Sequence, residues 1–140
     1  MPKDGDEVKT LNEIGENELI SRLAQYAPPN QLDDDTAEIQ CKRKNLLINT
    51  DLLIEGTHFS PITTEPKEIG WKAIAANFSD LAASGVDEIV GITVGLATPP
   101  ETPLSWVEEV YMGIKAALDE FGGDLLGGDC VNGKQKLLAI

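Results

Sequence analysis

The sequence predicts an α+β domain in which helices pack on one face of a mixed β-sheet. Segments with apolar residues at helical spacing alternate along the chain with short runs rich in apolar and β-branched residues, which are typical of strands. The last two strand-like segments flank the turn sequence "NGK" at 132–134 and fit a hairpin. The 140 residues, 41% of them hydrophobic, are enough for one domain with a buried core and no structural metal or disulfide framework.

The N-terminal part of the chain predicts a tail followed by a short helix. Residues 1–12 are polar and charged, and we expect a disordered tail there, with the folded domain over 13–140. The segment "GENELISRLAQYA" (15–27) places its apolar residues at helical spacing, and Pro28 ends that pattern because proline cannot continue the helical bonding. A loop with three consecutive aspartates, Asp33 to Asp35, follows.

The next segment predicts two strands and then a helix. Residues 37–51, "AEIQCKRKNLLINTD", are typical of two strands around a charged turn, and Asp51 stands at the end of the second strand. Pro66 suits the first turn of a helix and Gly85 suits its C-terminal end. Helical spacing puts Asp80 at the margin of the buried face.

The C-terminal half predicts a strand, a helix and two short strands. The run "VDEIVGITVGLA" (86–97) is rich in β-branched residues. Ser105 and Glu108 have the spacing of a capping box at the start of a helix that ends before Gly122 and Gly123. Two short strands, "DLLGGD" (124–129) and "KLLAI" (136–140), complete the sequence.

Composition narrows the class of protein. The chain carries 11 Lys and Arg against 24 Asp and Glu, a net charge of -13, which opposes nonspecific binding to nucleic acid or to an anionic membrane. Cys41 and Cys130 lack metal-site spacing, and we expect two buried thiols. The sequence contains no signal-peptide pattern and no apolar run long enough to span a bilayer, so we expect a soluble cytoplasmic protein.

Dispersed aspartates are the candidate metal ligands. Asp35, Asp51, Asp80 and Asp129 fall in a loop, at a strand end, in a helix and after a glycine pair, which are positions where chain segments meet. A buried carboxylate is costly unless it is paired or bound to a metal, so we interpret these residues as ligands of Mg²⁺ that carries nucleotide phosphates. The sequence has no P-loop and no dinucleotide-binding GxGxxG, which leaves "GGD" (127–129) as the glycine-rich phosphate candidate.

Each of these features has a simpler interpretation. The "GGD" sequence alone is more typical of a tight turn, and most of the acidic residues fit a solvated surface. His58 is the single histidine, and a lone histidine is more often structural than functional. A Ser/His/Asp hydrolase has no support from the motifs. Tyr111, Trp71 and Trp106 have the positions to stack on a base, but core packing is the default at helical spacing.

Five motifs in order resemble those of the thiamine-monophosphate kinase family, within the wider group of aminoimidazole ribonucleotide synthetase and selenophosphate synthetase. The resemblance covers about residues 13 to 140. The motifs are "GENELI", "DDTA", "NTDLLIEGTHF", "GWKAIAANFSDLAASG" and "LLGGDC". Their order is more specific than any one of them.

The resemblance implies direct, Mg²⁺-assisted transfer of the γ-phosphate of ATP to thiamine monophosphate, which yields thiamine diphosphate. It implies an N-terminal domain of the aminoimidazole ribonucleotide synthetase type whose sheet pairs with that of a second copy in a homodimer. No residue is assigned as a general base. The resemblance implies that His58 contacts the substrate, which overrides the interpretation of His58 as a structural residue. It also implies that ATP is contacted by Gly128, Asp129 and Tyr111. The implied metal ligands are Asp35, Asn49, Thr50, Asp51, Asp80 and Asp129.

The sequence also departs from the family pattern. Asp33 replaces a glycine before the paired aspartates, Asn49 stands where the family has Ser or Thr, and Cys130 replaces a threonine. Family members also carry a second, C-terminal domain that contributes further metal, ATP and substrate contacts. Two alternatives therefore stay open, namely a noncatalytic dimerisation or nucleotide-binding half of such an enzyme and a relative that acts on another substrate.

Overall fold

The structure is a computed structural model that describes residues 14, 17–18, 20–22, 24–26, 29–30, 34, 37–42 and 44–140. The tail expected over 1–12 lies outside the described residues, as does part of the helix expected over 15–27. Within that segment the described residues include the 3-10 helix η1 (Ala24–Tyr26). The rest of the chain forms an α+β domain, as predicted from the sequence.

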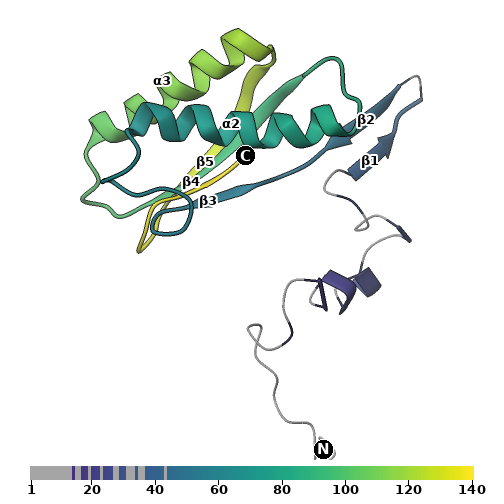
Figure 1. Ribbon diagram of the computed structural model, residues 1–140, viewed down its shortest axis with the longest axis horizontal. Coiled ribbons are helices and arrows are strands. Elements are labelled where there is room, and N and C mark those ends of the chain that lie inside the picture. The colour runs from purple at the N-terminus through teal and green to yellow at the C-terminus, as the bar shows by residue number, and fades with distance from the viewer. Residues whose placement is uncertain are drawn as a thin grey trace, which may run out of the picture.

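The strands form two sheets (Figure 1). β1 pairs with β2 in an antiparallel hairpin that extends away from the helices. The larger sheet has the order β3-β6-β4-β5 and is mixed, because β5 runs parallel to β4 while β6 runs antiparallel to both of its neighbours. The strands are β1 (Ala37–Gln40), β2 (Asn45–Ile48), β3 (Leu52–Ile54), β4 (Gly91–Thr98), β5 (Asp124–Asn132) and β6 (Leu137–Ala139).

The predicted hairpin between the last two strands is wrong. β4 lies between β5 and β6, so these consecutive strands are not neighbours in the sheet. The position of β6 between β3 and β4 buries Leu138 completely, whereas β5 is exposed along its whole length at the edge. Burial of an apolar side chain is worth about 1.5–3 kcal/mol, which favours the central position over a local hairpin.

Helices α2 (Pro66–Ala83) and α3 (Leu104–Phe121) both lie on one face of the larger sheet (Figure 1). Their backbones touch at two glycines: a Cβ atom on Gly70 would lie 2.0 Å from the Val110 carbonyl oxygen, and one on Gly113 would lie 1.9 Å from the Lys67 carbonyl oxygen. The core fills the space between the helices and the sheet. It includes Ile69, Ala73, Ile74, Val94, Leu96, Val110, Ile114, Ala117 and Leu138.

The ends of α2 match the prediction, but the start of α3 does not. Pro66 is the first residue of α2, and Gly85 follows it with a φ of 83°, which favours glycine. α3 begins at Leu104 with Pro103 as its N-cap, so Ser105 is inside the first turn and forms no capping box. The fixed φ of Pro103, -59°, starts the helix two residues earlier than expected.

Both cysteines are exposed, contrary to the prediction of buried thiols. Cys41 lies in the connection between β1 and β2, outside the core, and Cys130 lies on the exposed edge strand β5. Among the helices that the structure describes, none is long and apolar enough to cross a membrane.

Candidate functional site

The predicted site residues that the structure describes come from five parts of the domain. Asn49, Thr50 and Asp51 lie between β2 and β3. Asp51 therefore directly precedes β3, whereas the sequence predicted that it ends the preceding strand. Asp80 lies near the end of α2, and His58 lies in the turn after β3. Gly128 and Asp129 are on β5, and Tyr111 is on α3. Asp35 lies outside the described residues.

Asn77, on α2, joins the helix to the segment that carries Asn49 and Asp51. Its side chain is 2% exposed, and its Oδ1 accepts hydrogen bonds from the Asp51 backbone N–H at 3.1 Å and from Asn49 Nδ2 at 3.4 Å. Asn49 Nδ2 also donates to the Asn77 carbonyl oxygen at 3.0 Å. Asn77 Nδ2 donates to the Ala73 carbonyl oxygen at 2.9 Å, so every polar group of this buried amide is paired.

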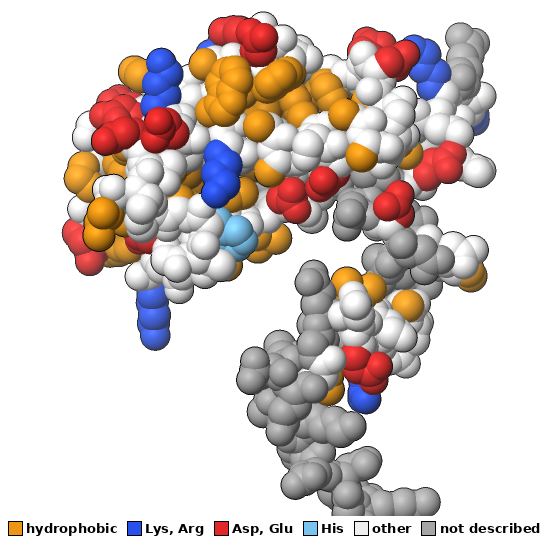
Figure 2. All heavy atoms as spheres, in the orientation of Figure 1, with side chains coloured by type: hydrophobic (Ala, Val, Ile, Leu, Met, Phe, Trp, Pro, Cys, Tyr) orange, Lys and Arg blue, Asp and Glu red, His pale blue; other side chains and the backbone are white. Residues whose placement is uncertain are grey.

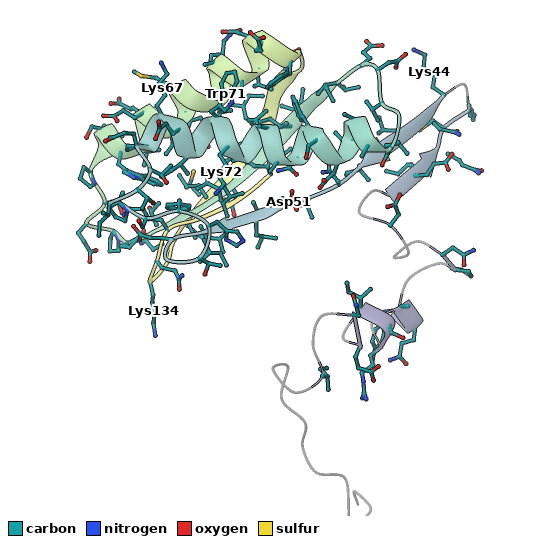
Figure 3. All side chains as sticks on the ribbon, viewed as in Figure 1. Lys44, Asp51, Lys67, Trp71, Lys72 and Lys134 are labelled. Carbon is teal, nitrogen blue, oxygen red and sulfur yellow. The ribbon has the colours of Figure 1, made fainter. Side chains whose placement is uncertain are left out.

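The junction around Asn77 places two acidic segments next to each other. Asp80 follows Asn77 by three residues, and residues at this spacing share one side of a helix. Asp51 and Asp80 are both half-buried. Figure 3 labels Asp51 beneath α2, and Figure 2 shows acidic side chains gathered on the same part of this face. These carboxylates are hard oxygen donors of the kind that Mg²⁺ prefers, so their chemistry fits the ion that the sequence predicts.

Asp129 lies at the opposite edge of the sheet. Leu52, Ala139, Gly95 and Asp129 form one register row across β3, β6, β4 and β5. Asp51 precedes Leu52, so the backbones at Asp51 and Asp129 are three strand spacings apart, which is about 14 Å. Within the described residues no three His, Cys, Asp or Glu side chains gather as a metal site.

Tyr111 lies near the β5 edge. Burial raises the pKa of the Tyr111 phenol above its usual value, and the neighbouring Cys130 raises this pKa further. The phenol thus keeps its proton at neutral pH and remains a hydrogen-bond donor. Because Cys130 follows Asp129 directly, this electrostatic effect indicates that Tyr111 lies on the same side of the domain as the "GGD" segment.

The turn that carries His58 is closed by its own backbone. The N–H groups of Thr57 and His58 both donate to the Ile54 carbonyl oxygen, at 3.1 and 2.9 Å. The His58 Nδ1 atom accepts a hydrogen bond from the Ile54 N–H at 3.0 Å. The imidazole is exposed, and Figure 2 shows this single histidine on the surface of the face in view.

A groove of about 870 Å³ borders the Asn77 junction. It is lined by β2, by three residues of α2 (Asn77, Phe78 and Leu81) and by the segment 85–93 that leads into β4. Asn49 and Asn77 contribute polar groups to it, while most of the other lining residues are apolar, including Leu46, Ile48, Phe78, Leu81, Ile92 and Ile140.

Sequence reasoning missed Asn77 and Lys72 as parts of the site. Asn77 is a polar residue on an otherwise apolar helix face, three positions before Asp80, and this signal could have identified it. Lys72 donates from Nζ to the His58 carbonyl oxygen at 2.5 Å, and no sequence pattern predicts that contact.

Comparison with known proteins places these residues in a family context. Residues 33–140 match the family described as "AIR synthase related protein, N-terminal domain". The chain is 58% identical over its full length to a thiamine-monophosphate kinase of Prochlorococcus marinus, and 40% identical over 94% of its length to one of Synechococcus elongatus. The chain spans about 42% and 40% of these curated relatives' lengths, respectively.

A solved structure described as AaThiL complexed with AMPPCP and TMP has the same fold. It superposes with a TM-score of 0.85 at 32% sequence identity, and the match covers 94% of this chain and 42% of that one. The resemblance found in the motifs is therefore confirmed.

Proposed function

Because the chain belongs to the AIR synthase related protein family through that family's N-terminal domain, we propose that it is the N-terminal domain of an ATP-dependent thiamine-monophosphate kinase. This enzyme, a transferase of thiamine diphosphate biosynthesis, moves the γ-phosphate of ATP to thiamine monophosphate. The observation that carries the proposal is the Asn77 junction, which joins the motif segments "NTD" (49–51) and "NFSD" (77–80) by hydrogen bonds. The similarity to thiamine-monophosphate kinases supports the choice of substrate.

The proposed metal ligands are Asp35, Asn49, Thr50, Asp51, Asp80 and Asp129. Mg²⁺ held by these residues would neutralise the negative charge of the phosphates during the transfer. The chain's own contribution is to position these ligands. Asn77 fixes the backbone of Asp51, and α2 holds Asp80 one turn away from Asn77. Catalysis is then by positioning and charge stabilisation, without a covalent intermediate.

Gly128, Asp129 and Tyr111 are the proposed ATP contacts. Gly128 has a φ of 159° and its missing Cβ would collide with the Val94 backbone, so glycine is required for the close packing of β5 on β4. The protonated Tyr111 phenol supplies a donor to the nucleotide. His58 is the proposed contact to thiamine monophosphate. The separation of about 14 Å between the Asp51 and Asp129 edges suits a nucleotide that extends across the sheet.

We also propose a cytoplasmic homodimer in which the sheet pairs with that of a second copy. Leu52 and Val131 are 49% and 54% exposed, and among the described strands β5 has a neighbour on one side only. Such an edge favours pairing with another chain. Light scattering tests this part directly: a mass of twice 15.1 kDa supports the dimer, and a monomer contradicts it.

A second candidate function is a noncatalytic nucleotide-binding or dimerisation half. It is favoured by the groove beside the Asn77 junction, which combines the polar groups of Asn49 and Asn77 with a mostly apolar lining and so suits ligand binding. The two functions differ in whether this chain alone produces thiamine diphosphate.

Calorimetric titration with ATP in Mg²⁺, followed by thiamine monophosphate, tests the proposed function. We expect saturable ATP binding that the Asp129→Asn variant loses, and binding of thiamine monophosphate to the ATP-loaded protein. Failure of a folded dimer to bind either ligand would contradict the proposal. Chromatographic assay of thiamine diphosphate in the same samples separates the enzyme from the noncatalytic half.

A further inference from the structure

We propose that Lys72 is a positioning residue that holds the turn at 54–59 so that His58 presents an Nε2–H donor to the substrate. This inference rests on the proposed function, because His58 is the proposed contact to thiamine monophosphate. It adds the protonation state of the ring, the kind of substrate atom that the ring meets, and a residue that controls its position.

The His58 ring has one nitrogen committed inside the turn. A backbone N–H can donate only to an unprotonated ring nitrogen, and the Ile54 N–H lies 3.0 Å from Nδ1. The neutral imidazole then carries its proton on Nε2. The exposed nitrogen of His58 is therefore a hydrogen-bond donor, and the substrate atom that it meets is an acceptor, such as a phosphate oxygen.

The position of β3 at the sheet edge explains why Ile54 needs this partner. The Glu55 N–H points toward β6 and donates to the Lys136 carbonyl oxygen at 3.0 Å. Successive N–H groups of a strand point in opposite directions, so the Ile54 N–H points away from the sheet. The His58 ring covers this edge group, which would otherwise have water as its partner.

Lys72 connects the turn to α2. Its Nζ donates to the His58 carbonyl oxygen at 2.5 Å across 14 residues of sequence, and Figure 3 labels its side chain where it extends from α2 toward the turn. The other side of the turn is anchored by the ion pair between Lys136 Nζ and Glu55 Oε1 at 2.8 Å. α2 also carries Asn77 and Asp80. Lys72 therefore ties the substrate-contacting residue to the helix that carries the metal-ligand candidates.

The chain has one histidine, so ¹⁵N resonances of its ring report on His58 alone. At neutral pH we expect wild type to give an unprotonated Nδ1, hydrogen-bonded to the Ile54 N–H, and a protonated Nε2. Lys72→Met should give a mixture of the two neutral tautomers in a folded protein. Lys72→Arg should restore the wild-type pattern, because arginine keeps a donor to the His58 carbonyl oxygen. Lys67→Met, on the same helix, is the matched control and should leave the ring unchanged.

Titration with thiamine monophosphate in the presence of Mg²⁺ and ATP is the second readout. It should shift the Nε2 resonance in wild type, with about tenfold weaker binding in Lys72→Met. A protonated Nδ1 in wild type, or a Lys72→Met ring identical to wild type, would overturn the proposal. If calorimetry shows that thiamine monophosphate binds but the Nε2 resonance does not shift, the assigned substrate contact is overturned. Absence of any binding in calorimetry would instead contradict the proposed function itself.

Discussion

The buried amide oxygen of Asn77 accepts a hydrogen bond from the backbone N–H of Asp51 at 3.1 Å. The two residues are 26 positions apart, and this bond fixes a non-strand segment between β2 and β3 against the middle of α2. Asp51, whose N–H makes this bond, and Asp80, three residues after Asn77 on the same helix, are both candidate Mg²⁺ ligands. Asn77 is thus a structural support of the proposed metal site.

Replacement of Asn77 by alanine should lower the free energy of unfolding by about 1–2 kcal/mol, because the Asp51 N–H keeps only its longer bond to the Ile140 carbonyl oxygen, at 3.3 Å, and Asn49 Nδ2 keeps only its bond to the backbone carbonyl of residue 77. Urea denaturation measures this change. Ser79→Ala is the control: its hydroxyl is exposed and donates only within the helix, to the Ala76 carbonyl oxygen, so we expect less than about 0.5 kcal/mol. Equal effects of the two substitutions would contradict the role of Asn77.

Gly113→Ala should destabilise the domain by at least about 2 kcal/mol, since the added methyl group would lie 1.9 Å from the Lys67 carbonyl oxygen and force α2 and α3 apart. Thermal unfolding followed by circular dichroism measures the loss. Gly127→Ala is the matched control, because a Cβ there has nothing within 4 Å, and we expect a change of about 0.5 kcal/mol or less. A Gly113→Ala protein as stable as wild type would show that the helices do not pack through this glycine.

Asp80→Asn should weaken Mg²⁺-dependent ATP binding by about tenfold or more, because it removes one carboxylate from the proposed metal site while it keeps the shape of the side chain. Asp87→Asn makes the same change in charge at an exposed position outside the proposed ligand set and should leave the affinity within about twofold. Calorimetry in Mg²⁺ compares the two variants. Equal weakening in both would point to net charge, rather than ligation, as the cause.

Tyr111 should make the domain sensitive to alkaline pH. Burial and Cys130 raise the pKa of Tyr111 in the folded state, so the folded protein holds this proton more tightly than the unfolded chain does. The associated stability is fully present below the unfolded pKa, about 10, and is lost as the pH rises through the folded pKa. Tyr111→Phe should therefore show a smaller loss of unfolding free energy above about pH 10. Identical alkaline profiles in urea denaturation would contradict this assignment.

Local signals predicted much of the fold. Pro66 and Gly85 set the ends of α2, and β-branched residues predicted β4, because these features act within a few residues of sequence. The separation of β5 and β6 by β4 was not predictable in the same way. An NGK turn favours a hairpin locally, but the burial of Leu138 between β3 and β4 is a long-range effect that no short window contains.

The candidate site shows the same division. The ordered motifs identified Asp51, Asp80 and His58 as residues of interest, whereas the partners that position them emerged from the fold. Asn77 lies 26 residues from Asp51, and Lys72 lies 14 residues from His58, so their hydrogen bonds depend on how α2 docks on the sheet. The exposure of Cys130 was missed for a related reason, because it follows from the position of β5 at an edge.

Paramagnetic relaxation by Mn²⁺ tests the central claim most directly, namely that the segments 49–52 and 77–81 form one metal-nucleotide site. Mn²⁺ replaces Mg²⁺ at oxygen-ligand sites and broadens nearby backbone amide resonances. With ATP present, we predict that substoichiometric Mn²⁺ broadens the amides of both segments together, with a second effect around Asp129. Selective broadening at exposed acidic positions of α3, such as Asp119 and Glu120, with both segments unaffected, would contradict the account.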